Sequence, residues 1–217
     1  KRYFPDIPLL LGGIYAQLCP DHAKTLGVDG VQTCQLNLPL RRPALDLYDN
    51  PEYGVTVTSI GCPLHCRYCA SGKLWPQYIR RPTEEVIAEI SFQASIPTVK
   101  DMALYDDALL MDKERHFYPL CERLKDGFSD LRFHAPNGLH VREIDELCAR
   151  YLFKVGFKTI RLSFEGTDPA VQRASSDKVC NLQYVQAVKN LLKAGYSLND
   201  IETYILVGLP GQSYESV

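Results

Sequence analysis

The stretch SIGCPLHCRYCA, Ser59 to Ala70, carries three cysteines, Cys62, Cys66 and Cys69, in the spacing C-x3-C-x2-C. Three thiolates so close in sequence can converge on one soft centre, and cysteine thiolate selects iron–sulfur clusters or zinc. The same spacing also falls on one face of a helix, which would make the three a buried stripe. The stretch is polar, however, and holds a glycine, a proline, a histidine and an arginine. A metal centre is therefore the first prediction.

Two other uses of these cysteines stay open. His65 could complete a four-ligand zinc set, but structural zinc sites usually present two separated ligand pairs, and the sequence shows no second pair of that spacing. The segment from Cys66 to Cys69 also fits a C-x-x-C redox site, which would leave Cys62 without a role. Three thiolates on an iron–sulfur cluster would leave one iron open for another ligand, so the spacing favours a reactive cluster.

The rest of the chain alternates between expected strands and expected helices. The strands cover residues 53–60, 102–105, 131–135, 159–164 and 201–207, and the helices cover residues 83–95, 112–125, 145–155 and 182–194. Thr83 is placed to cap the first helix, and a glycine follows each of the others. Parallel neighbours need a crossover helix, so this alternation predicts an α/β fold with a parallel sheet, either doubly wound or a TIM-like barrel. Ligands in both bind beyond the carboxyl ends of the strands.

The sequence suggests two domains. Residues 7–34 read as one strand, helix, strand step, and residues 35–52 hold several prolines and no sustained period, which indicates a linker. We therefore divide the chain into residues 1–50 and residues 51–217. Because the chain starts at Lys1 and its last residues read as the start of another helix, we expect a piece of a longer protein whose second domain is truncated.

Composition excludes several classes of protein. The 217 residues include 24 Lys and Arg against 26 Asp and Glu, a net charge of −2, so the chain lacks the basic footprint of nucleic-acid or anionic-membrane binding. The longest uncharged apolar stretch, residues 7–20, is shorter than the roughly 20 residues that cross a bilayer. Eight cysteines without a signal peptide indicate a reducing, cytoplasmic location. The five scattered cysteines are expected to be packing residues: Cys19, Cys34, Cys121, Cys148 and Cys180.

The segment from Cys62 to Cys69, with the aromatic Tyr68 directly before its third cysteine, resembles the signature of radical S-adenosylmethionine (SAM) enzymes. The strands and helices that follow are similar to the family's partial (β/α) TIM-like barrel. The resemblance implies that Cys62, Cys66 and Cys69 hold a 4Fe-4S cluster whose open iron binds SAM. It further implies that the reduced cluster cleaves SAM to a 5′-deoxyadenosyl radical, which abstracts a hydrogen from the substrate.

The same resemblance suggests residues that contact SAM. The backbone of Tyr68 would meet the adenine. Asp106 and Asp107 resemble an acidic pair of the cobalamin-associated branch, with Asp106 preferred as acceptor for the methionyl amine and loop solvation or helix capping as the alternative. The remaining implied contacts are Ser163 and Glu165 near the ribose and methionyl group, and Leu206 and Gly208 beside the adenine. Gly211 stands where many members have Glu, which weakens a polar adenine contact at that turn.

The N-terminal piece resembles the last strand and helix of a cobalamin-binding Rossmann-like domain, with Gly12 and Gly13 in its glycine turn. Cobalamin is therefore a candidate cofactor of the full-length protein. The resemblance implies an unidentified small-molecule substrate and an external flavodoxin- or ferredoxin-type electron donor, while membrane and nucleic-acid partners are disfavoured. Within the family a methylthiotransferase-type member is the alternative. A zinc-binding interaction module is the alternative from a different class.

Two further groups of residues have no assigned role in this reading. The basic and aromatic stretch from Lys73 to Arg81 could bind an anionic ligand, but packing at the barrel rim is favoured because the overall charge is nearly neutral. His134, at the end of the third expected strand, is the first histidine to test for proton transfer.

Overall fold

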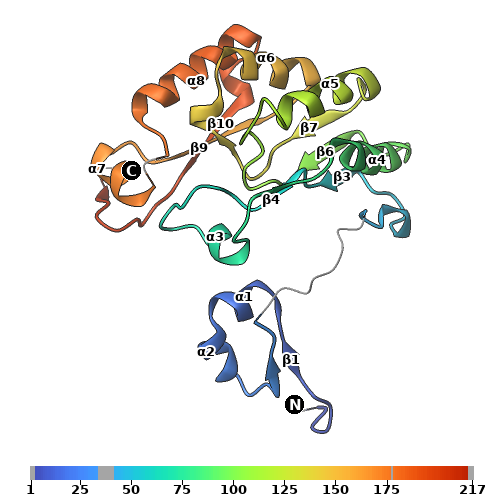
Figure 1. The fold of residues 1–217 in the computed structure, drawn as a ribbon, viewed down its shortest axis with the longest axis vertical. Helices are drawn as coiled ribbons and strands as arrows, with labels where there is room; N and C mark the ends of the chain where they lie inside the picture. The colour runs from blue at the N-terminus through green and yellow to red at the C-terminus, as the bar shows by residue number, and fades with distance from the viewer. Residues whose placement is uncertain (1–2, 34–41, 177, 215–217) are drawn as a thin grey trace.

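The computed structural model describes residues 3–33, 42–176 and 178–214 (Figure 1). Two parallel three-stranded sheets form the larger part, in the orders β3-β6-β7 and β10-β9-β8. These strands are β3 (Tyr53–Thr56), β6 (Asp101–Leu104), β7 (Arg132–His134), β8 (Leu139–His140), β9 (Ile160–Glu165) and β10 (Ile201–Ile205). A parallel bridge between Phe133 and Phe157 joins the two sheets, and β7 runs on into β8 along the chain. The predicted α/β fold with parallel strands is confirmed.

Helices lie against one side of these strands (Figure 1). They are α4 (Thr83–Ala94), α5 (Phe117–Gly127), α6 (Glu146–Val155), α7 (Pro169–Ser175) and α8 (Asn181–Ala194), with short 3-10 turns at Val141–Glu143 and Leu198–Asp200. Met102 and Leu104 of β6 and Phe133 of β7 are almost completely buried in one hydrophobic core with the helix residues Ile90 and Leu152. Burial of apolar surface between sheet and helices therefore holds the larger part together.

Three local predictions need correction. Thr83 is the first residue of α4 rather than its cap, and the N-cap residue Pro82 has no side chain that accepts a hydrogen bond. The helix expected from residue 112 begins at Phe117; Asp112 has a φ of +51°, outside the right-handed helical region, and turns follow it up to α5. The strand expected over residues 53–60 ends at Thr56. Its last two residues form β4 (Ser59–Ile60), antiparallel to β5 (Ile79–Arg80).

The ends of α6 and α8 agree with the sequence pattern. Asp145 caps α6 by accepting a hydrogen bond of 2.7 Å from the amide of Cys148. Gly156 and Gly195 follow the two helices with φ values of +92° and +117°. A side chain at either position would be strained, so glycine is the residue that lets each chain turn back toward its strand.

The N-terminal part forms a small separate parallel pair, β1 (Leu10–Leu11) with β2 (Gly30–Val31), connected by α1 (Gly13–Leu18) and α2 (Pro20–Lys24). The expected strand, helix, strand step is present with an additional helix. Cys34 and residues 35–41 of the expected linker lie outside the described residues, and a 3-10 turn at Leu45–Leu47 precedes β3. None of the helices in the described ranges has the length and apolar character that crossing a bilayer requires.

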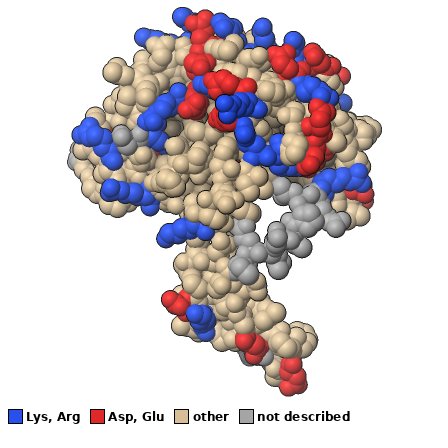
Figure 2. Space-filling view, in the orientation of Figure 1, with Lys and Arg blue, Asp and Glu red and all other residues tan. Residues whose placement is uncertain are grey.

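Charged side chains on the visible face are mixed rather than segregated. Figure 2 shows Lys and Arg interspersed with Asp and Glu over the helices of the larger part. The stretch that follows the cysteines takes part in this pairing, because Arg80 pairs with Asp112 and Arg81 with Glu89. The favoured packing role for that stretch is consistent with these contacts.

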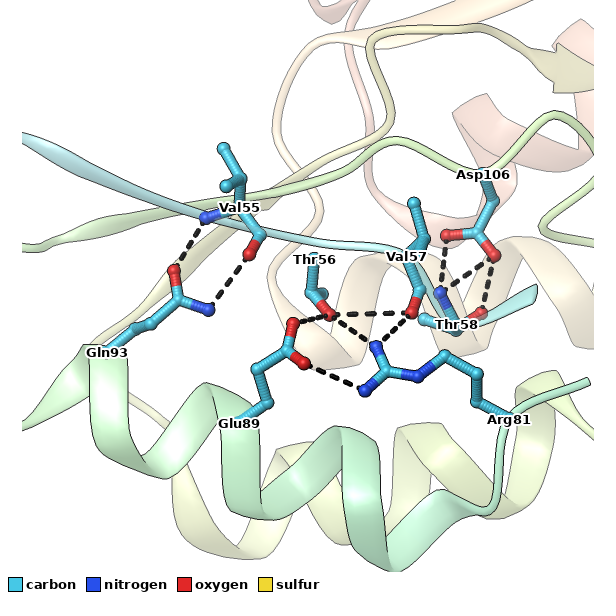
Figure 3. Close-up of polar contacts among 8 residues, drawn as sticks. All are labelled: Val55, Thr56, Val57, Thr58, Arg81, Glu89, Gln93 and Asp106. Carbon is cyan, nitrogen blue, oxygen red and sulfur yellow. Dashed lines mark hydrogen bonds and ion pairs between the residues drawn. The ribbon is translucent and has the colours of Figure 1, made fainter. Parts of the chain in front are cut away.

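The side of β3 that faces away from β6 is covered by side chains from α4 and from Arg81 (Figure 3). Gln93 binds both backbone groups of Val55: its Oε1 accepts from the amide at 2.8 Å, and its Nε2 donates to the carbonyl at 2.9 Å. Arg81 donates to the carbonyl of Val57 at 2.7 Å and pairs with Glu89 at 2.8 Å. Side chains thus take the place of a neighbouring strand on this side.

Replacing Gln93 should therefore destabilise the fold. A Gln93→Leu variant keeps the apolar contacts but leaves the amide and carbonyl of Val55 without partners, which we expect to lower the free energy of unfolding by about 1–3 kcal/mol. Urea denaturation of the full-length protein measures this change. Ser91→Ala, at an exposed position of the same helix, is the control and should leave the unfolding midpoint nearly unchanged. Equal midpoints for Gln93→Leu and the wild type would contradict the prediction.

Candidate functional site

The three cysteines lie on one loop between β4 and α3 (Ser71–Leu74). All three thiols are free; those of Cys62 and Cys66 are half-buried and that of Cys69 is exposed. The amide of Ser71 donates to the sulfur of Cys69 at 3.4 Å. The loop therefore presents three unpaired sulfur ligands beyond the carboxyl end of β3, where the parallel topology leads us to expect chemistry.

The thiols influence one another electrostatically. Burial raises the pKa of the Cys62 thiol, a hydrogen bond from the amide of Leu64 opposes this, and the negative charges of Cys66, Cys69 and Asp107 raise it further. The thiols of Cys66 and Cys69 and the carboxylate of Asp107 thus lie close enough to Cys62 to influence its charge. Within the described ranges no three His, Cys, Asp or Glu side chains meet closely enough to hold a single ion. Ligands of a cluster bind different irons and need not meet at one point, so three free thiols on one loop fit a cluster.

Gly61 gives the cysteine loop its shape. Its φ is +79°, and a Cβ atom there would lie 2.5 Å from the carbonyl oxygen of Gln77. The loop closes over its own return segment because β4 and β5 pair at its base. The far side is tied down by the amide of Arg67, which donates to the carbonyl of Ser175 at the end of α7 at 2.9 Å.

A methyl group at Gly61 should therefore disturb the loop. Gly61→Ala adds a strained backbone conformation and a clash with backbone, which we expect to cost about 1–3 kcal/mol of folding free energy and to reduce iron uptake. Thermal unfolding and iron analysis of the full-length protein measure both effects. Gly72→Ala is the matched control, since its Cβ would meet only the His65 ring, at 3.9 Å. If the two variants behave alike, the shape of the loop does not depend on Gly61.

The two carboxylates after β6 have different environments. Asp106 is 2 % exposed and accepts hydrogen bonds from the amide and hydroxyl of Thr58 (Figure 3). It also accepts from the amide and hydroxyl of Ser59. Asp107 is half-buried and accepts a hydrogen bond from the hydroxyl of Ser71 at 2.9 Å, and its negative charge raises the pKa of the Cys62 thiol. The sequence pattern favours Asp106 as the partner of an amine, whereas the structure uses that carboxylate inside the protein and turns Asp107 toward the cysteine loop.

A second charged group lies at the carboxyl end of β9. Glu165 is buried, has a φ of +74°, and pairs with Lys178. The ammonium of Lys178 lies 5.8 Å from the centre of the Tyr68 ring. Burial strongly raises the pKa of Tyr68, and the charges of Glu165 and Cys66 add to that rise. Lys178, which pairs with Glu165 and lies near the Tyr68 ring, therefore connects the end of β9 to the cysteine loop.

The other predicted contacts flank Glu165. Ser163 is buried and lies opposite His140 in the strand register. Burial, followed by the charge of Lys178, lowers the pKa of His140 to about 4. On the other side, the amide of Leu206 donates to the carbonyl of Glu165 at 2.9 Å, and Gly208 has a φ of +91°. The structure therefore places Ser163, Glu165 and Leu206 together at the carboxyl end of β9.

Some contributing residues have no sequence signal. Lys178 follows Glu165 by 13 positions in no motif, and Ser71 is an ordinary helix-start serine. Gly61, next to Cys62, could have been noticed as a turn glycine. His134 lies apart from this group: its Nε2 is 2.8 Å from Asp101, beside a shallow cavity of about 320 Å³ that Tyr105 and Arg161 also line.

Comparison with known proteins decides the family. The family model "Radical SAM superfamily" matches residues 56–217. The chain belongs to the radical SAM superfamily. The predicted family and the expectation of an enzyme are thereby confirmed, and the three cysteines lie within the matched range.

Two curated relatives of this radical SAM chain are methyltransferases. An uncharacterised methyltransferase of Pyrococcus horikoshii is 27% identical over 173 residues, which cover 78% of this chain and 36% of the relative. Cytidylyl-2-hydroxyethylphosphonate methyltransferase of Streptomyces wedmorensis is 23% identical over 169 residues, covering 76% and 30%. The radical SAM chain thus spans about a third of the length of these relatives.

Solved structures share the fold. The radical SAM methyltransferase TsrM of Kitasatospora setae, with tryptophan and a SAM analogue bound, aligns with a TM-score of 0.68 at 17% identity, covering 84% of this chain and 35% of TsrM. The cobalamin-dependent SAM radical enzyme OxsB, with aqua-cobalamin and SAM bound, aligns with a TM-score of 0.63 at 11% identity, covering 90% and 35%.

Proposed function

We propose that this chain is the core of a cobalamin-dependent radical SAM methyltransferase, in which residues 51–217 form an incomplete (β/α) barrel. The observation that carries the proposal is the loop of three free thiols, set beside Asp107 and Glu165 at the carboxyl ends of parallel strands. The methyl-transfer reaction is proposed because both curated relatives are named methyltransferases. Cobalamin is proposed from the fold shared with TsrM and OxsB.

The proposed ligands of a 4Fe-4S cluster are Cys62, Cys66 and Cys69. A bound cluster supplies the electron that cleaves SAM reductively and leaves one iron free to chelate SAM. The role of the protein is to hold the three sulfurs on one loop and to leave the fourth iron of the cluster without a protein ligand. Gly61 and the β4–β5 pair shape that loop, and the contact between Arg67 and Ser175 fixes its far side.

The proposed SAM site surrounds this loop. Asp107 has a carboxylate near the cysteines and would accept hydrogen bonds from the methionyl amine of SAM. Glu165 and Lys178 offer both signs of charge to a ligand that carries an amine and a carboxylate. Ser163 would contact the ribose, and Tyr68, Leu206 and Gly208 would border the adenine. Asp106 is left out of this contact set because its carboxylate is already hydrogen-bonded to Thr58 and Ser59.

Residues 1–50 are proposed to be the C-terminal remnant of a cobalamin-binding Rossmann-like domain. The parallel pair of β1 and β2 and the φ of +83° at Gly13 support that proposal. This remnant contacts the larger part through Gln17, whose amide donates to the carbonyl of Lys73 at 3.3 Å. We also propose an intracellular enzyme that acts on a small molecule and takes electrons from a flavodoxin- or ferredoxin-type protein.

Anaerobic reconstitution of the full-length protein with iron and sulfide tests the cluster. We expect a broad visible absorbance and about four irons per chain in the wild type, and loss of both when Cys62, Cys66 or Cys69 is replaced by alanine. Cys180→Ser is the control, because Cys180 is exposed and distant in sequence. Tight stoichiometric zinc binding without colour would favour the zinc-binding module instead.

Asp107→Asn tests the SAM site. Losing the charge that accepts from the methionyl amine should weaken SAM binding about tenfold, with the iron content unchanged. Isothermal titration of the reconstituted protein with SAM measures the dissociation constant. Asp112→Asn is the control, because Asp112 is exposed and pairs with Arg80. Unchanged SAM affinity in Asp107→Asn would remove Asp107 from the site.

The product of the reaction distinguishes the two kinds of radical SAM enzyme. A product that gains a methylthio group, rather than a methyl group alone, would favour a methylthiotransferase.

A further inference from the structure

Two adjacent carboxylates hold the two ends of the cysteine loop. Asp106 binds Thr58 and Ser59, which lead into the loop three residues before Cys62. Asp107 accepts from Ser71, two residues after Cys69. One dipeptide at the end of β6 therefore fixes where the loop begins and where it ends.

The hydrogen bonds of Asp106 at the start of the loop are closely spaced and buried. Thr58 is fully buried, and Ser59 and Asp106 are each 2 % exposed. The Asp106 carboxylate receives the Thr58 amide at 3.0 Å, the Ser59 amide at 2.5 Å, and the two hydroxyls at 2.7 Å each. Burial raises the pKa of Asp106, and these four donors counteract that rise. Charge-assisted hydrogen bonds in a water-free place are strong and directional, so the backbone of Thr58 and Ser59 has little freedom.

A third element joins this contact. The Thr58 hydroxyl lies 2.8 Å from Nε2 of His116, the residue before α5. The hydroxyl has one proton, which it donates to Asp106, so His116 must donate its Nε2 proton to Thr58. The chain of hydrogen bonds runs from His116 through Thr58 to Asp106 and connects the start of α5, the exit of β3 and the exit of β6.

We propose that Asp106, Thr58 and Ser59 form a positioning network that sets the orientation of the cysteine loop without touching cluster or SAM. The inference rests on the proposed function, since it requires the loop to carry the cluster. The two carboxylates then have different roles. Asp106 fixes the backbone that leads to Cys62, whereas Asp107 accepts from Ser71 with one oxygen and would bind SAM with the other. An asparagine at position 106 would turn an amide toward four donors, so the start of the loop would shift.

The test compares full-length reconstituted variants that differ in this network. Asp106→Asn should lose its cluster to an iron chelator about tenfold faster than the wild type and change the electron paramagnetic resonance spectrum of the reduced cluster with SAM. Thr58→Val should show a smaller change in the same direction. Thr58→Ser retains the hydroxyl and should behave as the wild type.

The matched control is Gln93→Leu. Gln93 is fully buried and holds both backbone groups of Val55 in β3, at 2.8 and 2.9 Å, away from Thr58 and Ser59. It should lower the melting temperature and leave the spectrum and the rate of cluster loss unchanged. Asp106→Asn with the rate and spectrum of the wild type would overturn the inference, and so would equal cluster loss in Gln93→Leu. If Asp106→Asn does not fold, the Thr58→Val and Thr58→Ser pair decides, and equal rates overturn it.

Failure of the proposed function looks different. A wild-type protein that takes up no iron–sulfur cluster overturns both the function and this inference. A wild type that binds the cluster and SAM, with variants that match it, overturns the positioning network alone.

Discussion

The hydrogen bonds between Asp106 and the Thr58–Ser59 segment are the contact on which the site depends. The ladder between β3 and β6 ends at Thr56 and Leu104, with one further bond from the amide of Tyr105 to the carbonyl of Thr56, and Asp106 extends the connection between the two strands to Thr58 and Ser59. The cysteine loop begins directly after this contact and ends at Ser71, which Asp107 holds. A buried charge is costly unless its partners satisfy it, and here the cost is offset by four donors that belong to the segment being placed.

Parallel strands explain why distant residues meet beside this loop. The carboxyl ends of β3, β6 and β9 carry the cysteine loop, the acidic pair and Glu165. Helices cover the opposite face, so the apolar core can be made from one set of side chains while the strand ends remain free for polar groups. Lys178, which pairs with Glu165 and lies near the Tyr68 ring, connects the end of β9 to the loop that follows β3. The hydrogen bond from Arg67 to Ser175 connects the end of α7 to the same loop.

Local sequence patterns predicted the parallel α/β fold and the family. Strand length, helix period and the spacing of Cys62, Cys66 and Cys69 are all properties of residues that are close together in the sequence. The Gly156 and Gly195 helix ends were predictable for the same reason. Choosing between Asp106 and Asp107 was not, because adjacent carboxylates differ only in what the folded chain places around them. Lys178 was missed because α7 separates it from Glu165 in the sequence, so only the folded chain brings the two together. The helical pattern from residue 112 did not reveal the turns that precede α5, of which the positive φ of Asp112 is one part.

The contact between Gln93 and Val55 has a consequence for how the sheet can grow. An exposed edge strand offers unpaired amides and carbonyls to any passing chain, which is a route to edge-to-edge association. Here Gln93 already occupies both groups of Val55, and Arg81 occupies the carbonyl of Val57. A further strand, from this protein or another, would have to displace those side chains before pairing with β3. Side chains therefore protect this edge of the β3-β6-β7 sheet against the addition of a strand.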